Sequence, residues 1–302
     1  MTPIFSSASA GGLLFVLLWS SGYLGAHFAL QGFAPFTATV LRFAGSALII
    51  GVWVALRRSA GPAPTKPDLL RAALAGLFLQ AGFFGFTYAA MHTGASAAAA
   101  GLIAGLMPLL TALGGRVFLG ESLGRYTVPG ALIGLTGVGL VLTPMLATPG
   151  TLLGLMLALC ALASLSGGTL LQRRHPVALE PRTALLVQLL VALVILLPFA
   201  ALEGFAMTPT PAAIAGVVWV TLINSCCGLL LYLWLLRTGS ARVVSGWFYL
   251  VPPVTGVMAM LVLGDRFGLW QWTGFALAAV GVWLAQRGPA LSSNGPTSPS
   301  RE

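Results

Sequence analysis

The chain has 302 residues, of which 58% are hydrophobic and only 7% are charged, and its mean hydropathy is +0.95. This composition leaves too little polar surface to cover a water-soluble globule, so an ordinary soluble domain is excluded. The 15 Lys and Arg residues exceed the 6 Asp and Glu residues and give a net charge of +9. Because these cations fall in short clusters between long apolar runs, they indicate orientation in a lipid bilayer, and no nucleic-acid partner is expected.

Long apolar stretches follow one another along most of the chain. A membrane-spanning helix needs about 20 mainly apolar residues to cross a hydrocarbon core about 30 Å thick. Ten stretches meet this requirement, so the sequence predicts an all-α integral membrane protein with ten transmembrane helices. The predicted spans are Gly11–Leu30, Pro35–Leu56, Leu69–Met91, Ala95–Phe118, Thr127–Met145, Thr151–Leu171, Pro181–Ala200, Pro211–Leu236, Ala241–Leu263 and Trp270–Gln286.

The residues outside these stretches predict the orientation. Residues 1–10 carry no Lys or Arg, so we expect the first span to be a retained helix and not a signal peptide. With ten spans, 13 of the 15 Lys and Arg residues fall on the side of the N-terminus. The positive-inside rule then places both termini in the cytoplasm, with the chain in the cytoplasmic (inner) membrane. Residues 288–302 are rich in Ser, Gly and Pro, and we expect a disordered cytoplasmic tail.

The sequence repeats itself at an offset of 144 residues. Pro108 aligns with Pro252, Leu119-Gly120-Glu121 aligns with Leu263-Gly264-Asp265, and Gly137 aligns with Gly281. The repeats predict two domains, residues 11–145 and 151–287, with five spans in each. Because five is an odd number of crossings, the second half enters the membrane from the opposite side. Two inverted five-helix repeats are typical of a secondary transporter that alternates between two states.

Several short motifs carry a resemblance to a known family. They are Leu18-Trp19-Ser20-Ser21-Gly22, Leu41-Arg42-Phe43, Gly94-Ala95-Ser96, Met107-Pro108 and Leu119-Gly120-Glu121. With the five-plus-five duplication, they resemble the EamA-type branch of the drug/metabolite transporter superfamily. The resemblance implies a ten-helix basket that exports small metabolites, often amino acids or related amphipathic solutes, without an ATP-binding component. Where many relatives carry a Lys, this chain has His27, so a role for that cation does not carry over.

The leading prediction is a secondary exporter of a small-molecule substrate that works by alternating access. Alternatives are an importer or exchanger of sugar-type or phosphorylated solutes and, from another class, a membrane sensor or a lipid flippase. Phosphorylated substrates favour several cations, whereas Arg42 is the only cation well inside a predicted span. No His-Glu-x-x-His motif or intramembrane Asp pair suggests an enzyme, and we expect no metal or cofactor.

Four polar residues form two pairs at the offset of the repeat. Gln80 and Asn224 lie near the middle of their spans, and Tyr88 and Tyr232 follow eight residues later in each half. Symmetry-related polar groups near the bilayer midplane favour a substrate site. The alternative is hydrogen bonding between helices, worth about 0.6 kcal/mol per bond.

Arg42 is the one fully charged side chain well inside a span, and its repeat partner is Gln188. Burial of a charge in a bilayer costs about 2.5–3.5 kcal/mol on insertion scales, so a partner is required. One hypothesis is a substrate carboxylate, which a guanidinium binds as a two-pronged fork. The alternative is a structural arginine that binds helix-end carbonyls or reaches the outer surface.

Other expected site residues are aromatic or titratable. Trp19, Trp247 and Tyr249 lie within spans, where some aromatic side chains are expected to line a central cavity and others to pack in the core. His27 and His92 lie near the outer ends of their spans, either as proton-coupling groups or as ordinary interfacial residues.

Small residues recur on the last span of each half, where Gly130, Gly134 and Gly137 correspond to Gly274, Ala278 and Gly281. Such faces allow close helix packing, either within one chain or in a homodimer through the fifth and tenth helices.

Overall fold

The computed structural model describes residues 7–56, 64–143, 151–228, 231 and 247–287. Within these ranges the regular elements are helices, and one isolated antiparallel bridge joins Phe33 and Met207. The predicted C-terminal tail, residues 288–302, lies outside the described residues.

The helices of the two halves follow the same order. The first half contains α1 (Ser7–Ala29), α2 (Pro35–Leu56), α3 (Lys66–Gly76), η1 (Leu77–Gly82), α4 (Phe83–His92), α5 (Ala97–Ala104), α6 (Met107–Leu119) and α7 (Thr127–Leu142). The second half contains α8 (Thr151–Arg174), α9 (Pro181–Leu202), α10 (Pro211–Trp219), η3 (Val220–Cys227), η4 (Phe248–Leu250), α13 (Val251–Met258), η5 (Ala259–Leu263) and α14 (Leu269–Ala285). Of the η elements, η4 is a 3₁₀-helix and the other three are π-helices that continue a neighbouring α-helix.

These elements form ten apolar helical runs in the described residues. Six are long and apolar enough to cross a membrane, namely Gly11–Ala29, Pro35–Leu56, Lys66–His92, Ala97–Leu119, Thr151–Arg174 and Pro181–Leu202. Four are shorter, namely Thr127–Leu142, Pro211–Cys227, Val251–Leu263 and Leu269–Ala285. Each of the ten overlaps a predicted span, and the prediction of an all-α membrane protein is confirmed.

The outer surface of the bundle is apolar, as a lipid environment requires. Large apolar side chains within the helical runs are exposed. Leu132, Val194 and Leu261 expose 63%, 72% and 73% of their surface, respectively. The largest buried cluster, which includes Leu102 and Phe275, lies where α5, α7, α8 and α14 meet. A bundle with an apolar core and an apolar exterior is stable only where its surroundings are also apolar.

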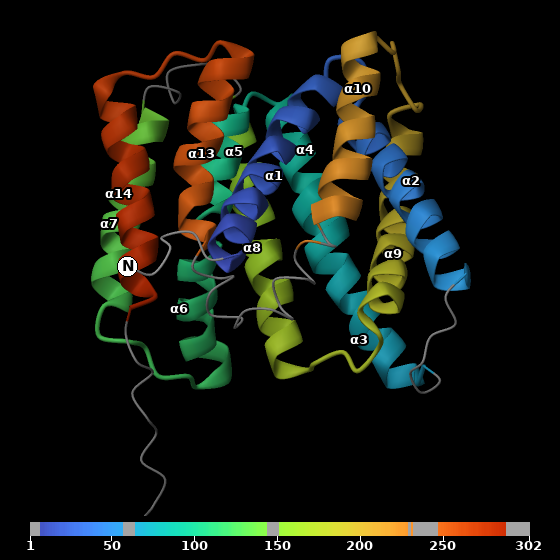
Figure 1. The fold of residues 1–302 in the computed structure, drawn as a ribbon, viewed down its shortest axis with the longest axis horizontal. Coiled ribbons are helices and arrows are strands. Elements are labelled where there is room, and N and C mark those ends of the chain that lie inside the picture. Colours follow the sequence, from blue (N-terminus) through green and yellow to red (C-terminus); the bar gives the residue numbers. More distant parts are fainter. Residues whose placement is uncertain (1–6, 57–63, 144–150, 229–230, 232–246, 288–302) are drawn as a thin grey trace, which may run out of the picture.

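The two halves pack as related copies. The second helices, α2 and α9, contact each other, and so do the fifth helices, α7 and α14. The first helix of each half packs on the third of the other, in the pairs α1 with α10 and α8 with α4. In Figure 1 the pair α7 and α14 lies on one side of the bundle and the pair α2 and α9 on the other. Exchanging the halves leaves this pattern unchanged, as a pseudo-two-fold axis requires.

The contact between α7 and α14 uses the small residues that the sequence singled out. A Cβ atom on Gly137 would come within 2.5 Å of the Gly274 carbonyl oxygen, and one on Gly281 within 2.5 Å of the Gly130 carbonyl oxygen. The glycine faces therefore pack on each other within the chain. A homodimer through these two helices would have to use their other faces, and it stays a prediction.

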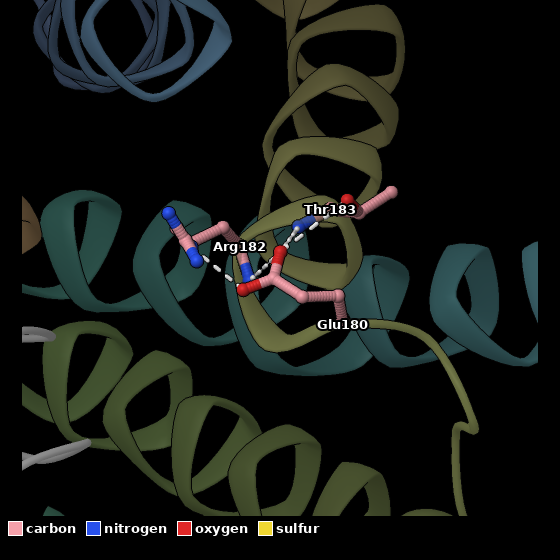
Figure 2. A network of polar contacts seen from close by, with 3 residues as sticks. All are labelled: Glu180, Arg182 and Thr183. Carbon is pink, nitrogen blue, oxygen red and sulfur yellow. Dashed lines mark hydrogen bonds and ion pairs between the residues drawn. The ribbon is translucent and has the colours of Figure 1, made fainter. Parts of the chain in front are cut away.

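A glutamate carboxylate caps the N-terminus of α9 (Figure 2). The Glu180 side chain accepts hydrogen bonds from the backbone N–H groups of Arg182 and Thr183, at 3.1 and 3.2 Å. Its other oxygen accepts a 2.6 Å bond from the Arg182 guanidinium, which also lies over the Trp53 ring of α2. A carboxylate is favourable here because the first amides of a helix lack partners within the helix.

The equivalent helix α2 is capped by a carboxylate from the other half. Glu203, directly after α9, accepts hydrogen bonds from the backbone N–H groups of Phe36 and Thr37, at 3.1 and 2.9 Å. The Thr37 hydroxyl donates a third bond, at 3.0 Å. The link between α9 and α10 is thus tied to the start of α2, which fixes the two halves together at this end of the bundle.

The glycine contact predicts unequal effects for two neighbouring substitutions on α7. Gly137→Ala places a methyl group against the backbone of α14, whereas a Cβ on Gly139 meets no atom within 4 Å. We expect Gly137→Ala to destabilise the protein by about 1–3 kcal/mol through overpacking. Gly139→Ala should be neutral or slightly stabilising, because Ala is the better helix former. Thermal unfolding in detergent measures both changes, and equal melting temperatures for the two variants would contradict the close α7–α14 contact.

Candidate functional site

The two predicted midplane amides lie in equivalent interruptions of the helical pattern. Gln80 belongs to the π-helix η1 and Asn224 to the π-helix η3. Shifting η1 by the repeat offset of 144 places it within η3. Short π-helical segments inside α-helices are frequent at functional sites, because they change the direction of side chains within one turn. The sequence predicted the pairing of the amides but not the π-helices.

Each of these amides contacts the opposite half of the chain. Asn224 Nδ2 donates a 2.6 Å hydrogen bond to the Leu18 carbonyl oxygen on α1 and packs on Gly22. Gln80 Nε2 donates a long bond, 3.5 Å, to Gln188 Oε1 on α9. No hydrogen bond joins Gln80 to Asn224 among the described residues. The amides therefore lie at two symmetry-related places on the interface between the halves.

Arg42 lies on α2 at the position that corresponds, in the repeat, to Gln188 on α9. Its side chain is 5% exposed, and Nε donates a 3.2 Å hydrogen bond to Ser225 Oγ in η3. Its Cζ atom lies 4.0 Å from the centroid of the Phe84 ring, a cation–π geometry. The second helix of each half thus contacts the π-helix of the other half. Arg42 of α2 bonds Ser225 of η3, and Gln188 of α9 bonds Gln80 of η1.

Tyr23 is a buried polar residue that sequence reasoning missed. It is 5% exposed and belongs to the buried cluster against which Trp19 and Phe84 pack, and the Arg42 guanidinium lies over the Phe84 ring. The Tyr23 hydroxyl has no hydrogen-bond partner of acceptable geometry among the described residues. The available signal was its position directly after the Leu18-Trp19-Ser20-Ser21-Gly22 motif.

The same motif supplies further polar contacts to the second half. Ser21 Oγ donates to the Leu18 carbonyl oxygen at 2.7 Å and accepts a 3.0 Å hydrogen bond from Trp219 Nε1 of α10. Ser20 Oγ donates a long bond, 3.5 Å, to the Val251 carbonyl oxygen of α13. The motif therefore faces the partner half and not the lipid.

The structure distributes the predicted aromatic residues over several places. Trp19 and Trp247 pack against the buried cluster that contains Tyr23. The Trp247 ring also contacts Gly12. Tyr88 is 1% exposed in another cluster, and its hydroxyl has no partner among the described residues. Tyr249 packs against the cluster between α7 and α14. Tyr232 lies outside the described residues.

The two histidines differ in their surroundings. His92 is exposed at the end of α4, whereas His27 is partly buried in the last turn of α1. Asp265 lies in the link between η5 and α14, where burial raises the pKa of its carboxyl above the ordinary value and the positive charge of His27 offsets part of that rise. His27 therefore has an acidic residue within electrostatic range.

The described residues contain neither a cluster that could bind a metal ion nor a disulfide bond. No group of three His, Cys, Asp or Glu side chains in the searched part of the chain could hold a metal ion. Cys160, Cys226 and Cys227 carry free thiols. What these residues offer is an interface of amides, hydroxyls, aromatic rings and one guanidinium between two related halves.

Comparisons with known proteins give a family, two named relatives and a solved fold. The model of the EamA-like transporter family matches residues 7–143 and 152–286. The chain is 26% identical to the "Uncharacterized inner membrane transporter YedA" of Escherichia coli (strain K12), over 93% of this chain and 91% of that protein. It is 22% identical to an "Uncharacterized transporter" of Archaeoglobus fulgidus, over 90% of this chain and 94% of that one. A crystal structure with 23% sequence identity has the same fold, with a TM-score of 0.66 over 92% of this chain and 96% of that chain.

Proposed function

The chain belongs to the EamA-like transporter family, and we propose that this multi-pass membrane transporter exports small metabolites by alternating access. The proposed solutes are amino acids or related amphipathic compounds. A non-enzymatic role agrees with relatives that are named as transporters. The name of the Escherichia coli relative supports an inner membrane location, and we propose that both termini lie in the cytoplasm.

The observation that carries this proposal is the pair of equivalent contacts between the halves. Arg42 of α2 contacts η3, and Gln188 of α9 contacts η1. In transporters built from inverted repeats, the substrate binds near the midplane where the repeats meet. Each repeat can then adopt the conformation of the other, which closes one side of the membrane as the opposite side opens.

The proposed substrate contacts are the residues that the sequence predicts for the site. They are Trp19, Arg42, Gln80, Tyr88, Asn224, Tyr232, Trp247 and Tyr249, with His27 and His92 as proposed proton-coupling groups. Backbone contacts such as that of Asn224 with Leu18 would have to exchange for substrate contacts during transport. The orphaned Asn224 Oδ1 atom, which is buried without a partner among the described residues, favours such an exchange.

The orientation predicts one-sided labelling of two exposed positions. In a variant with Ala at the native cysteines, we expect Lys66→Cys, at the first residue of α3, to react with an impermeant maleimide only from the cytoplasm. Met207→Cys, between α9 and α10, should react only from outside, since five spans, an odd number, separate the two positions. Reaction of both cysteines from the same side of intact cells would overturn the orientation.

The midplane pair predicts matched losses of transport. Gln80→Leu and Asn224→Leu each remove an amide with little change in bulk, and we expect each to slow export about three- to tenfold. The double variant should lose less than the product of the two single effects if both amides act on one bound solute. Mass spectrometry of metabolites in medium and cytosol, normalised to folded protein, measures the losses.

The control for this series is Thr136→Val, which removes an exposed hydroxyl on α7 that donates a hydrogen bond to the Leu132 carbonyl oxygen of its own helix. It should export at the rate of the unmodified chain. Full export per folded molecule in both amide variants, with lowered melting temperatures, would instead assign the amides to helix packing.

A further inference from the structure

Arg42 is a buried cation that no acidic residue of the described chain neutralises. Asp68, Glu121 and Glu180 pair with Arg71, Arg173 and Arg182 at helix ends. Glu203 caps α2, and Asp265 lies in the link before α14. The sixth acidic residue, Glu302, is the last residue of the chain.

A charge in this position needs a counter-charge or several hydrogen bonds. Removing a cation from water costs several kcal/mol, and pairing with a hydrogen-bonded anion offsets that cost. The structure gives the Arg42 guanidinium one hydrogen bond among the described residues, from Nε to Ser225, and a stacking contact with Phe84. Its two terminal Nη groups form no further bond within those residues, although a guanidinium offers five N–H donors.

A second donor packs against the same aromatic ring. The Tyr23 hydroxyl is buried and makes no hydrogen bond of acceptable geometry among the described residues. Tyr23 belongs to the buried cluster against which Phe84 packs, and the Arg42 guanidinium lies over the Phe84 ring. Ser225 donates its own proton to the Val220 carbonyl oxygen at 3.1 Å, so its oxygen is free to accept from Arg42 Nε. Ser225 therefore orients the guanidinium and leaves the Nη groups for another acceptor.

We propose that the Arg42 Nη groups and the Tyr23 hydroxyl bind one carboxylate group of the transported solute, with Ser225 as a positioning residue. This inference rests on the proposed transport function and names its substrate class. The solute carries a carboxylate and an apolar or aromatic body that contacts Phe84, while amines without a carboxylate are rejected. A single cation suits a carboxylate, whereas a phosphate dianion favours several.

Three probes with one aromatic body test the requirement for a carboxylate. They are 3-phenylpropanoate, 3-phenylpropanamide and 3-phenylpropylamine, and their binding to the purified full chain in detergent is measured by intrinsic tryptophan fluorescence. We expect the acid to bind at least about tenfold more tightly than the amide, because charge-assisted hydrogen bonds are the stronger ones. The amine should not compete with the acid. Equal binding of acid and amide, or tight binding of the amine, would overturn the proposal.

Substitutions locate the binding group. Tyr23→Phe should weaken binding of the acid about tenfold and leave binding of the amide nearly unchanged. Arg42→Lys keeps the charge but removes the guanidinium that binds a carboxylate through two parallel hydrogen bonds, so the preference for acid over amide should fall. Ser225→Ala should lower the same preference by releasing the guanidinium.

Two matched controls remove buried hydroxyls that have no partner among the described residues but lie on other helices. Ser166→Ala on α8 and Thr111→Val on α6 should keep the acid-to-amide preference. If the Arg42 variant does not fold, Tyr23→Phe against these controls still decides. Equal effects of Tyr23→Phe and the controls would assign the Tyr23 hydroxyl to packing and overturn its part in the site.

The binding assay separates this inference from the proposed function, because it requires no transport. Selective binding of the acid without export of any metabolite would support the site and contradict the exporter. Export of solutes that lack a carboxylate, with no binding of the acid, would support the exporter and overturn the inference.

Discussion

Each half of this chain packs against the other as against a rotated copy of itself, and the remaining features depend on that constraint. Two equivalent helices can meet along their length only if their facing residues are compatible with each other. The fifth helices, α7 and α14, satisfy this condition with glycine, and their backbones approach within the space that a Cβ would need. The second helices, α2 and α9, have a carboxylate cap at the N-terminus of each. Glu180 caps α9 from the same half, and Glu203 of the second half caps α2 of the first. These outer pairs leave the π-helices η1 and η3 to contact the opposite second helices near the centre.

The central contacts are equivalent in position but not in charge. On one side an amide meets an amide, and on the other a guanidinium meets a hydroxyl. The helices are therefore arranged symmetrically, but only one of these two central contacts contains a charged group. Alternating access requires the symmetry of the scaffold, whereas recognition of a solute requires its asymmetry, because a solute with one polar end needs a wall that differs from its partner.

Much of the architecture follows from sequence, because span length and the repeat are properties of the chain itself. The ten spans and the family could be predicted in this way, as could the small-residue faces of α7 and α14. The partners of individual polar groups could not. Gln188 aligns with Arg42 in the repeat, yet it bonds Gln80, since the partner depends on the rotation and tilt of packed helices. Tyr23 escaped notice for the same reason: its apolar ring fits any membrane helix, and only its neighbours make its hydroxyl significant.

In the proposed transport cycle, the two halves open opposite sides of the membrane in turn. Spin labels test it at two pairs of exposed positions in a chain without native cysteines. One pair, Ala212 and Leu269, lies where α10 and α14 begin, and the other, Leu70 and Val128, lies at the opposite end of the bundle, near the starts of α3 and α7 (Figure 1). Pulsed electron resonance in liposomes, with and without 3-phenylpropanoate, measures both distances. Alternating access requires that conditions that shorten one distance lengthen the other. Two distances that stay fixed, or that change in the same direction, would contradict alternating access.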